Sequence, residues 1–411
     1  MSFSKIRTLV LYANYTDQLS YYDDWRDAFQ SAPDFAVTVA NICRKHEQDE
    51  IKKNLAEYDF IVLLHSVLAD TLKFVTPLKE ALRERKSKLL AFVGNEVNLP
   101  LVPLKDKIGF IQDIRAEFVG TQLPLAAGQW LYSECQETRV VALPHALNPA
   151  IFFPAVAPEK RPIDIGTRTH EYGPYMGDNE RNELLKFFSK YKFPRPLKID
   201  LSANSRFDRA GWAGFLNNCK GTIATEAGSY YLEKDDHTIN AIFEYIRQGR
   251  KQPVKRIVNY NSRIQGVYER LPHPLKLLVK NIMYPAAKKL FKVKHQFQAF
   301  EGIGFSEIYD KFYRHYPLNQ PPVYTKAISS RHFDAIGTKT CQIMFKGEFN
   351  GILQADRHYL ALERNFSNID NVMKRFLDTG YRQEMVSQTY EYILAEHTYQ
   401  HRLKTIRRLL D

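Results

Sequence analysis

The hydrophobic positions in the first 150 residues predict short buried strands that alternate with amphipathic helices. The predicted strands are apolar on both faces and lie at residues 6–12, 35–39, 60–65, 89–93 and 116–119. The predicted helices between them lie at residues 23–30, 48–57 and 78–85. Strands with two apolar faces that alternate with helices are typical of a parallel sheet covered on both sides. Ligands bind such sheets at the carboxyl ends of the strands, which here carry Asn14, His65, Asn95 and Glu96.

The second half of the chain repeats this alternation after a proline-rich segment. Its predicted strands lie at residues 163–166, 197–201, 221–225, 341–345 and 358–362, and its first two predicted helices at residues 179–190 and 209–217. Pro144, Pro149 and Pro154 resist continuation into helix or sheet, so residues 155–162 are predicted to be a linker. The pattern predicts an α/β fold of two doubly wound Rossmann-like domains that face a cleft. The expected bounds are 1–157 and 158–411, with a basic helical insertion in the second domain at about 232–322.

Residues 329–370 combine polar, ionisable and apolar side chains more densely than any other stretch. Ser330 is predicted to cap a short helix, and residues 341–345 follow as a buried strand. Two glycines bracket a turn around Glu348, and Ser367-x-x-Asp370 is a capping-box signature that predicts the start of another helix. This order places charged residues at the junctions between elements.

Length and composition limit the class of protein. A chain of 411 residues fits two domains, and 44% hydrophobic with 25% charged residues is typical of soluble globular proteins. No apolar run reaches the roughly 18 residues of a membrane span, and residues 1–5 lead into a predicted strand and not a signal peptide. The four isolated cysteines form neither a metal-ligand pattern nor a disulfide framework, so a reducing cytosol is expected: Cys43, Cys135, Cys219 and Cys341.

The net charge of +12 is concentrated in one segment. Residues 250–295 hold twelve Lys and Arg against one acidic residue, Glu269, which predicts an anionic partner. Within residues 275–292, lysines alternate with apolar and aromatic residues at near-helical spacing, interrupted by Pro285. Such a helix can lie in a membrane interface, with five lysines facing anionic lipid: Lys276, Lys280, Lys288, Lys289 and Lys292. The alternative is an insertion that packs its apolar side on the domain and leaves these lysines in water.

Four short segments match the motifs of one known enzyme family. They are residues 144–149, PHALNP, with Phe153-Pro154; residues 225–229, TEAGS; residues 331–335, RHFDA; and residues 397–403, HTYQHRL. In this order they resemble the domain-joining segment, the E-S-G-A/S element, the R-x-F-E-A donor-site segment and the terminal HTY-x-HR segment of GT-B glycosyltransferases, of the family 1-like kind found with bacterial surface polysaccharide synthesis. The resemblance implies an acceptor-side first domain and a second domain that binds a nucleotide-sugar donor.

The donor's phosphate would need cations, helix N-termini and backbone amides where negative charge builds up. The resemblance and the strand-end positions together give the expected donor-binding residues: Arg168, Arg206, Glu226, Arg331, His332, Asp334, Glu348 and His358. Asp334 stands where the family pattern has glutamate, which shortens its reach to a ribose hydroxyl by one methylene. No metal site is predicted, and no cofactor is expected besides the nucleotide-sugar substrate.

Each donor-binding candidate also has a structural interpretation. The three arginines could be surface ion-pair partners, and Asp334 could simply favour the N-terminal end of its helix. Glu226 could be a capping or buried carboxylate. Glu348 and His358 lie beside glycine turns, where polar residues often serve hydrogen bonding.

An inverting transfer would also need a base for the acceptor hydroxyl, supplied by the first domain. The candidate catalytic residues at strand ends are His65 and Glu96, although no motif spacing supports either. Each could instead be a satisfied polar residue.

Three functions follow from these observations. The first is a glycosyltransferase that moves a sugar from a nucleotide-sugar to a growing surface glycan, such as a polysaccharide, lipopolysaccharide or lipid-linked acceptor. The second is a non-catalytic nucleotide or sugar binder of the same fold, and the third a basic peripheral-membrane adaptor. Nucleic acid is not an expected partner, because no base-stacking or groove-binding motif is present. The expected location is the cytoplasm, with contact to the inner face of the membrane. The sequence does not determine the donor nucleotide and sugar, the acceptor, the stereochemical outcome or the oligomeric state.

Overall fold

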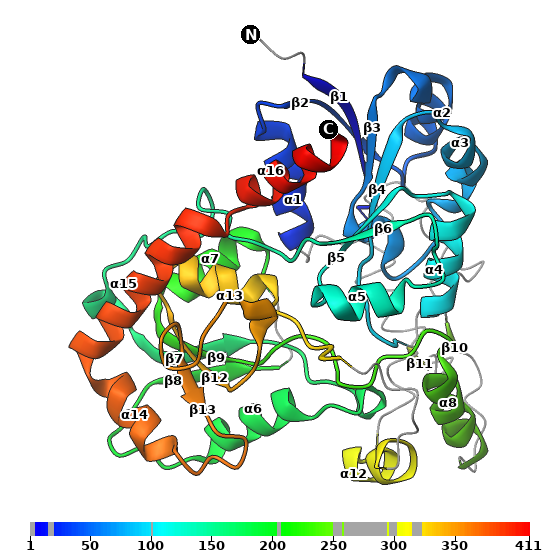
Figure 1. The fold of residues 1–411 in the computed structure, drawn as a ribbon. Helices are drawn as coiled ribbons and strands as arrows, with labels where there is room; N and C mark the ends of the chain where they lie inside the picture. The colour runs from blue at the N-terminus through cyan, green and yellow to red at the C-terminus, as the bar shows by residue number, and fades with distance from the viewer. Residues whose placement is uncertain are drawn as a thin grey trace, which may run out of the picture.

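The computed structural model describes residues 5–14, 20–99, 102–203, 207–249, 257–258, 294–295, 302–314 and 323–411. Arg206 and the five lysines Lys276, Lys280, Lys288, Lys289 and Lys292, which were predicted from the sequence to bind donor or membrane, lie outside the described residues. The described chain forms two α/β domains, each built on a parallel sheet (Figure 1). The predicted α/β fold of two doubly wound Rossmann-like domains is confirmed by the two parallel sheets and the helices between their strands.

The first sheet has six strands, all of them parallel to their neighbours. In spatial order they are β2 (Phe35–Asn41), β1 (Ile6–Tyr12), β3 (Phe60–Leu63), β4 (Lys88–Phe92), β5 (Phe118–Thr121) and β6 (Arg139–Ala142). The helices are α1 (Ser20–Ser31), α2 (Lys45–Asn54), α3 (Lys79–Glu84), α4 (Leu104–Asp113) and α5 (Leu125–Leu131). The residues of β3, and those of β4 after the exposed Lys88, are buried and contribute alternately to two apolar clusters, one on each face of the sheet.

The second sheet has five strands in the order β13 (Leu360–Leu362), β12 (Cys341–Phe345), β9 (Cys219–Ala224), β7 (Ile163–Arg168) and β8 (Ile199–Ser202). Its helices are α6 (Glu180–Lys190), α7 (Arg209–Asn217), α13 (Ser330–Gly337), α14 (Ile369–Leu377) and α15 (Thr379–Glu396). The chain passes from β7 outward to β8 and then back across to β9. The strand order therefore reverses between β7 and β9, which is the switch point of this domain.

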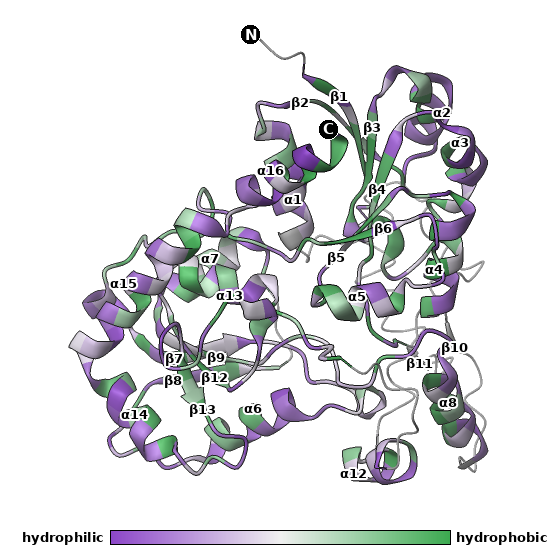
Figure 2. Cartoon of the chain, viewed as in Figure 1, coloured by the Kyte–Doolittle hydropathy of each residue, from purple (hydrophilic) through white to green (hydrophobic). Residues whose placement is uncertain are grey.

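The helices show the amphipathic pattern that packing against a sheet requires. Figure 2 shows them in alternating bands of hydrophilic and hydrophobic residues. In α14, Val372, Met373 and Phe376 are buried against the second sheet. Because this face is apolar and the other is charged, the helix covers the sheet and keeps its polar side in water.

The last helix, α16 (Tyr399–Leu410), returns to the first domain and lies beside α1 (Figure 1). Tyr399, Leu403 and Ile406 belong to the same apolar cluster as Trp25 of α1. A bridge between Leu147 and Thr398 pairs the interdomain segment with the residue before α16. The two domains are thus linked by two crossings of the chain.

Part of the segment predicted as an insertion lies against both domains. Its described elements are α8 (His237–Gly249), β10 (Ile257–Val258), β11 (Lys294–His295) and α12 (Phe305–Ile308). Ile239, Ile242 and Ile246 of α8 pack against Tyr175 of the second domain. Just before α8, the Asp236 carboxylate accepts hydrogen bonds from Asn98 and Lys105 of the first domain, at 3.3 and 3.1 Å.

Three details of the predicted elements were wrong. The N-cap of α13 is Ser329 and not Ser330, because Ser329 and His332 bond reciprocally in a capping box. Helix α14 begins at Ile369, and Asn368, not Ser367, precedes it as N-cap. His358 lies in the turn before β13, which begins at Leu360. None of the helices in the described part of the chain combines the length and apolar character needed to cross a membrane.

Candidate functional site

A cavity of about 30 Å³ lies at the switch point of the second sheet. It is enclosed by the carboxyl ends of β7 and β9, by α6, and by the first residues of α13. The polar residues that line it are Thr167, Thr169, Arg181, Thr222, Thr225, Ser329 and Arg331. Two arginines, several hydroxyl-bearing residues and a helix N-terminus therefore line one small space, and these groups are of the kind that binds an oxyanion. The Arg181 guanidinium itself lies 3.9 Å from the ring of Tyr172.

One residue that lines this cavity has a hydroxyl without a hydrogen-bond partner in the described part of the chain. Thr225 is almost fully buried, and its Oγ1 makes no hydrogen bond with any of the described residues. A buried hydroxyl without a partner is costly to folding. The unsatisfied donor is explained if the site accepts a polar ligand.

Arg331 lies at the start of α13, as predicted, and lines the cavity. Its Nη1 donates a hydrogen bond to the carbonyl oxygen of Arg168 at 3.0 Å, so the structure brings these two candidates together. The Arg168 guanidinium itself turns toward β8, where Nη2 bonds Asp200 at 2.9 Å and the group lies 4.2 Å from the ring of Phe215. Arg168 is thus part of an ion pair at the edge of the site, with its charge directed away from the cavity.

Glu226 follows Thr225 at the end of β9, and its carboxylate is held from two sides. Oε1 accepts a hydrogen bond from the backbone N–H of Phe349 at 2.7 Å, and Oε2 accepts one from the Tyr324 hydroxyl. Burial raises the pKa of Glu226, which these two hydrogen bonds partly offset. Glu348, next to Phe349 in the chain, is exposed at the start of the short turn Phe349–Gly351.

The two other candidates on α13 are buried inside the domain. His332 Nδ1 accepts the Ser329 N–H at 2.9 Å, and burial lowers the pKa of this imidazole to about 3. Asp334 Oδ2 accepts a hydrogen bond from Trp212 Nε1 at 3.0 Å. Burial, together with the nearby Asp24 carboxylate, raises the pKa of Asp334 well above its ordinary value. Asp334 therefore lies behind Trp212, which itself lines the cavity.

His358 is placed elsewhere. It lies at the amino end of β13, opposite to the carboxyl ends that form the cavity. Its Nδ1 accepts the Gln354 N–H at 3.0 Å, and its ring stacks on Tyr392 of α15 at 4.8 Å. The structure thus does not bring His358 to the other donor-binding candidates.

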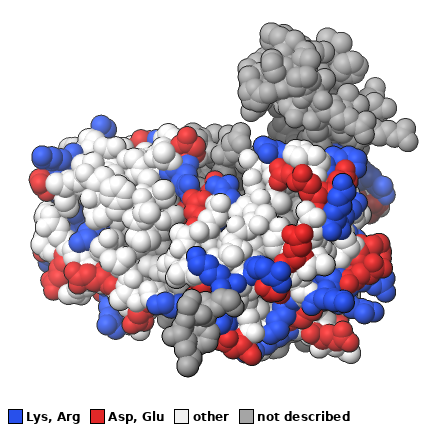
Figure 3. Space-filling model, turned by 90° about the horizontal axis from the view of Figure 1, so that it is seen from above, with Lys and Arg blue, Asp and Glu red and all other residues white. Residues whose placement is uncertain are grey.

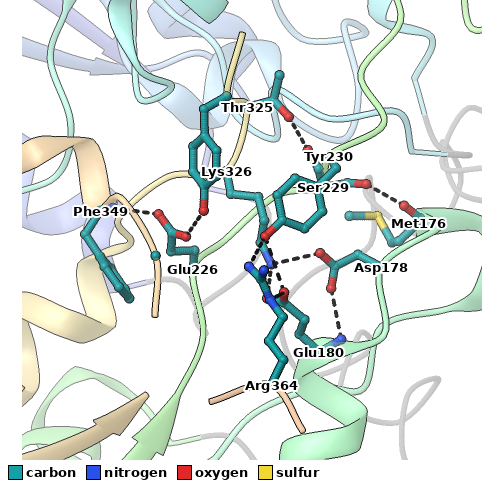
Figure 4. Close-up of polar contacts among 12 residues, drawn as sticks. Met176, Asp178, Glu180, Glu226, Ser229, Tyr230, Thr325, Lys326, Phe349 and Arg364 are labelled. Atoms are coloured by element: carbon teal, nitrogen blue, oxygen red, sulfur yellow. Dashed lines mark hydrogen bonds and ion pairs between the residues drawn. The ribbon is translucent and has the colours of Figure 1, made fainter. Parts of the chain in front are cut away.

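A buried ion network lies beside the site and contains residues that sequence patterns did not indicate (Figure 4). The ammonium group of Lys326, fully buried, lies 2.8 Å from Asp178 Oδ2 and also contacts Glu180. The second oxygen of Glu180 accepts a hydrogen bond from Arg364 Nε at 2.6 Å. Burial alone would lower the pKa of Lys326, but the two carboxylates raise it above its ordinary value, so this lysine stays charged.

Arg364 reaches from this network into an open groove. The groove has a volume of about 580 Å³ and is lined by Lys346, Glu363, Arg364, Asn365 and Ser367, which follow β12 and β13. Ligands bind at the carboxyl ends of parallel strands, and Arg364 lies two residues after the predicted strand 358–362, so its position is a signal that the sequence contains. Arg181 and Lys326 carry no such signal, because one is a charged residue on a helix and the other lies in no predicted element.

The candidate bases of the first domain are enclosed. His65 follows β3 and is fully buried against Phe92 and His145, with ring centroids at 4.6 and 5.1 Å. Its ring nitrogens have no hydrogen-bond partner among the described residues, and burial lowers its pKa well below the ordinary value. Glu96 accepts hydrogen bonds from the Gln122 N–H at 2.8 Å and the Tyr132 hydroxyl at 2.7 Å, and burial raises its pKa.

Within the described ranges, no group of three or more His, Cys, Asp or Glu is arranged to hold a metal ion. The four cysteines are free thiols, and burial raises the pKa of three of them, Cys135, Cys219 and Cys341.

No family model and no curated protein matches the chain. Solved structures are similar in fold over nearly the whole chain. HepE of Anabaena in complex with UDP and glucose has 9% identity and a TM-score of 0.48, with 98% of this chain and 99% of that chain covered. A glycosyltransferase of Rickettsia africae ESF-5 has 9% identity and a TM-score of 0.47, with 99% and 98% covered. The N-terminal domain of a Candida albicans trehalose-6-phosphate phosphatase has 11% identity and a TM-score of 0.44, with 99% and 97% covered.

Proposed function

We propose that this protein is a glycosyltransferase that binds a nucleotide-sugar at the carboxyl edge of its second sheet and transfers the sugar to a glycan. The observation that carries the proposal is the switch-point cavity, which is lined by Arg181, by Arg331 at the start of α13, and by Thr225, whose buried hydroxyl has no hydrogen-bond partner among the described residues. These groups are suited to a phosphate oxyanion, and the segment around Arg331 is the one that resembles the donor site of GT-B transferases.

The chemistry follows from this placement. An acceptor hydroxyl oxygen bonds to the anomeric carbon of the sugar, while the bond from that carbon to the phosphate oxygen breaks. The nucleotide leaves with an added negative charge, which the two guanidinium groups and the helix N-terminus stabilise. The proton of the acceptor hydroxyl must go to a base. His65 and Glu96 stay predictions for that role, although both side chains are enclosed and burial lowers the pKa of His65, which weakens it as a base.

A thermal-shift panel of UDP, GDP, CMP and dTDP tests the proposal. At least one nucleotide should raise the melting temperature of the wild type, and R331A should abolish that rise. R83A serves as the matched control, because Arg83 is exposed on α3 in the first domain. If none of the four nucleotides changes the melting temperature of the wild type, the proposed donor site is wrong.

The enclosure of both candidate bases favours a second function, a nucleotide or sugar binder without turnover. One experiment distinguishes the transferase from the binder. The protein is incubated with the nucleotide-sugar of the nucleotide that raises its melting temperature, and release of the free nucleotide is measured. Release with an added glycan acceptor supports the transferase. Binding without any release supports the binder.

We propose further that the acceptor is a growing surface glycan and that residues 250–295 hold the enzyme at an anionic membrane surface. This segment carries a surplus of eleven positive charges, which leaves a surplus of only one for the rest of the chain. On the face shown in Figure 3, basic and acidic residues of the described chain are accordingly interspersed. Sedimentation with vesicles that contain or lack anionic lipid, at low and high salt, tests this part: binding should require anionic lipid and weaken with salt.

A further inference from the structure

The turn that follows β12 has an unusual backbone. Phe349, Asn350 and Gly351 have φ angles of 43°, 55° and 72°, so three successive residues lie in the left-handed region. A bulky residue such as Phe is rare there. The ring of Phe349 is fully buried, with His332 and Tyr359 at centroid distances of 5.3 and 5.0 Å. The packing around this ring therefore stabilises a left-handed backbone conformation that Phe349 would rarely adopt by itself.

On one side, the turn is fixed to Glu226 at the donor edge (Figure 4). The N–H of Phe349 donates to Glu226 Oε1 at 2.7 Å. Gly347 lies so close that a Cβ at this position would be 2.2 Å from Glu226 Oε2. The turn and the carboxylate thus fit together without space between them, so that a displacement of one displaces the other.

On the other side, the same turn is bonded to the first domain. Asn350 Nδ2 donates to the carbonyl oxygen of Gln122 at 3.0 Å, while Asn350 Oδ1 accepts the N–H of Ile328 at 2.8 Å. The N–H of Gln122 in turn donates to Glu96 at 2.8 Å. Bonded groups therefore connect Glu226 of the second domain with Glu96 of the first through the turn and Gln122.

We propose that the turn at residues 347–351 is an interdomain clasp, in which Glu226 and Asn350 are positioning residues that transmit occupation of the donor edge to the first domain. This inference rests on the proposed function for the identity of the ligand. Glu226 is the next residue after Thr225, which lines the cavity, so a phosphate bound there acts on the end of β9 that carries Glu226. The left-handed backbone makes the clasp short and stiff, and the Asn350 amide completes it by reaching Gln122.

Variants of Asn350 isolate the interdomain bond. N350D keeps the oxygen that accepts the Ile328 N–H, and Asp tolerates the left-handed region as Asn does. It loses only the donor to Gln122 and places a carboxylate opposite a carbonyl oxygen. N350G keeps the backbone conformation without steric cost, and loses both bonds. N54D is the matched control, because Asn54 is exposed at the end of α2.

Variants of Glu226 test the other end of the clasp. E226Q keeps one oxygen for the Phe349 N–H, and its amide nitrogen can donate a hydrogen bond to the Tyr324 oxygen, so its ligand-free radius of gyration should stay that of the wild type. E226A removes both acceptors and should behave as N350D does.

The experiment is small-angle X-ray scattering of the wild type and the variants, alone and with UDP, GDP, CMP or dTDP, together with thermal-shift titrations. Loss of one hydrogen bond across the interface is expected to shift the ratio of closed to open molecules about fivefold. N350D should therefore have a larger radius of gyration than the wild type without ligand. The nucleotide that stabilises the wild type should lower the wild-type radius of gyration, and should need an about fivefold higher concentration to stabilise N350D.

The outcomes separate the clasp from the donor site. If N350D and N350G have the wild-type radius of gyration and the wild-type nucleotide response, the clasp is refuted, since a merely local role for Asn350 leaves both unchanged. If no nucleotide binds the wild type, the proposed function fails, and the clasp is decided by the ligand-free radius of gyration of N350D against the wild type and N54D.

Discussion

Arg209 Nη1 donates a hydrogen bond to Asp24 Oδ1 across 2.9 Å, which joins α7 of the second domain to α1 of the first. The same nitrogen lies 2.7 Å from Asp27, and Asn148 of the interdomain segment donates to Asp24 at 2.7 Å. Asp24 is almost completely buried. One carboxylate thus connects both domains and the segment between them, and its ionisation affects how they are held together.

The stability of this connection should depend on pH. Burial raises the pKa of Asp24 from 3.8 to about 6, against the opposing effect of Asn148 and Arg209. Because its pKa is raised, the Asp24 carboxyl binds its proton more tightly in the folded state than in the unfolded state. The contribution of this protonation to the free energy of unfolding is therefore complete below pH 4 and is lost as the pH rises through 6. D24N keeps an oxygen for both hydrogen bonds and does not titrate. Its free energy of unfolding, relative to that of the wild type, should therefore rise by up to about 3 kcal/mol between pH 4 and pH 7. Urea unfolding at several pH values measures this.

The comparison needs an exposed control, and D34N supplies it because Asp34 is exposed between α1 and β2. The difference in free energy of unfolding between D34N and the wild type should be the same at every pH. A constant difference between D24N and the wild type from pH 4 to pH 7 would contradict the expected titration of Asp24.

The sequence predicted most of the fold because both sheets are built from strands whose residues are apolar on both faces. In β3 and β12 every residue is buried, so the hydrophobic runs marked these strands directly. Helix α4 was not predicted: its buried Lys107, which donates to the Gly94 carbonyl at 2.8 Å, interrupts the apolar face. The return of α16 to the first domain depends on tertiary packing with Trp25, which no local pattern contains.

The candidate site was predictable only in part. Arg331 and Glu226 lie where the sequence pattern placed them, at the start of α13 and after the end of β9, and their part in donor binding stays a prediction. Lys326 was not predicted, because its buried ammonium group is paired with Asp178 and Glu180, which lie almost 150 positions earlier in the sequence. Pairings over such separations are decided by the fold. Arg168 lies at the end of β7 and Asp334 lies on α13, as predicted. The directions of their side chains are set by Asp200 and Trp212, and the sequence does not reveal these pairings.

The buried lysine should be essential to stability. K326M removes the charge while keeping much of the volume, and leaves Asp178 and Glu180 buried without their shared cation. Breaking a buried ion pair in this way typically costs about 3–5 kcal/mol. Urea unfolding should show a loss of this size for K326M and almost none for K52M, because Lys52 is exposed on α2. The double variant K326M/D178N should recover part of the loss, and an equal or larger loss would contradict the assignment of the cost to unpaired carboxylates.

Thr225 should show opposite effects on stability and on binding. T225V replaces the unpartnered buried hydroxyl with a methyl group of similar size. Since no hydrogen bond is lost in the free protein, its melting temperature should stay the same or rise. Binding of the nucleotide that stabilises the wild type should weaken about fivefold, the equivalent of one lost hydrogen bond. T405V is the control, because the Thr405 hydroxyl bonds the His401 carbonyl on α16, far along the chain from the cavity. Unchanged nucleotide affinity in T225V would show that the hydroxyl does not serve the ligand.

The C-terminal helix should stabilise the first domain and not the second. Ile406 of α16 is fully buried in the cluster that contains Trp25 and Phe29 of α1. I406A leaves a cavity there and should cost about 2–5 kcal/mol, while K404A, at an exposed position of the same helix, should cost little. Hydrogen exchange locates the effect. In I406A, amides of α1 and β1 should exchange faster, whereas those of β9 and β12 should keep their protection. Equal loss of protection in both sheets would mean that α16 stabilises the two domains as one cooperative unit.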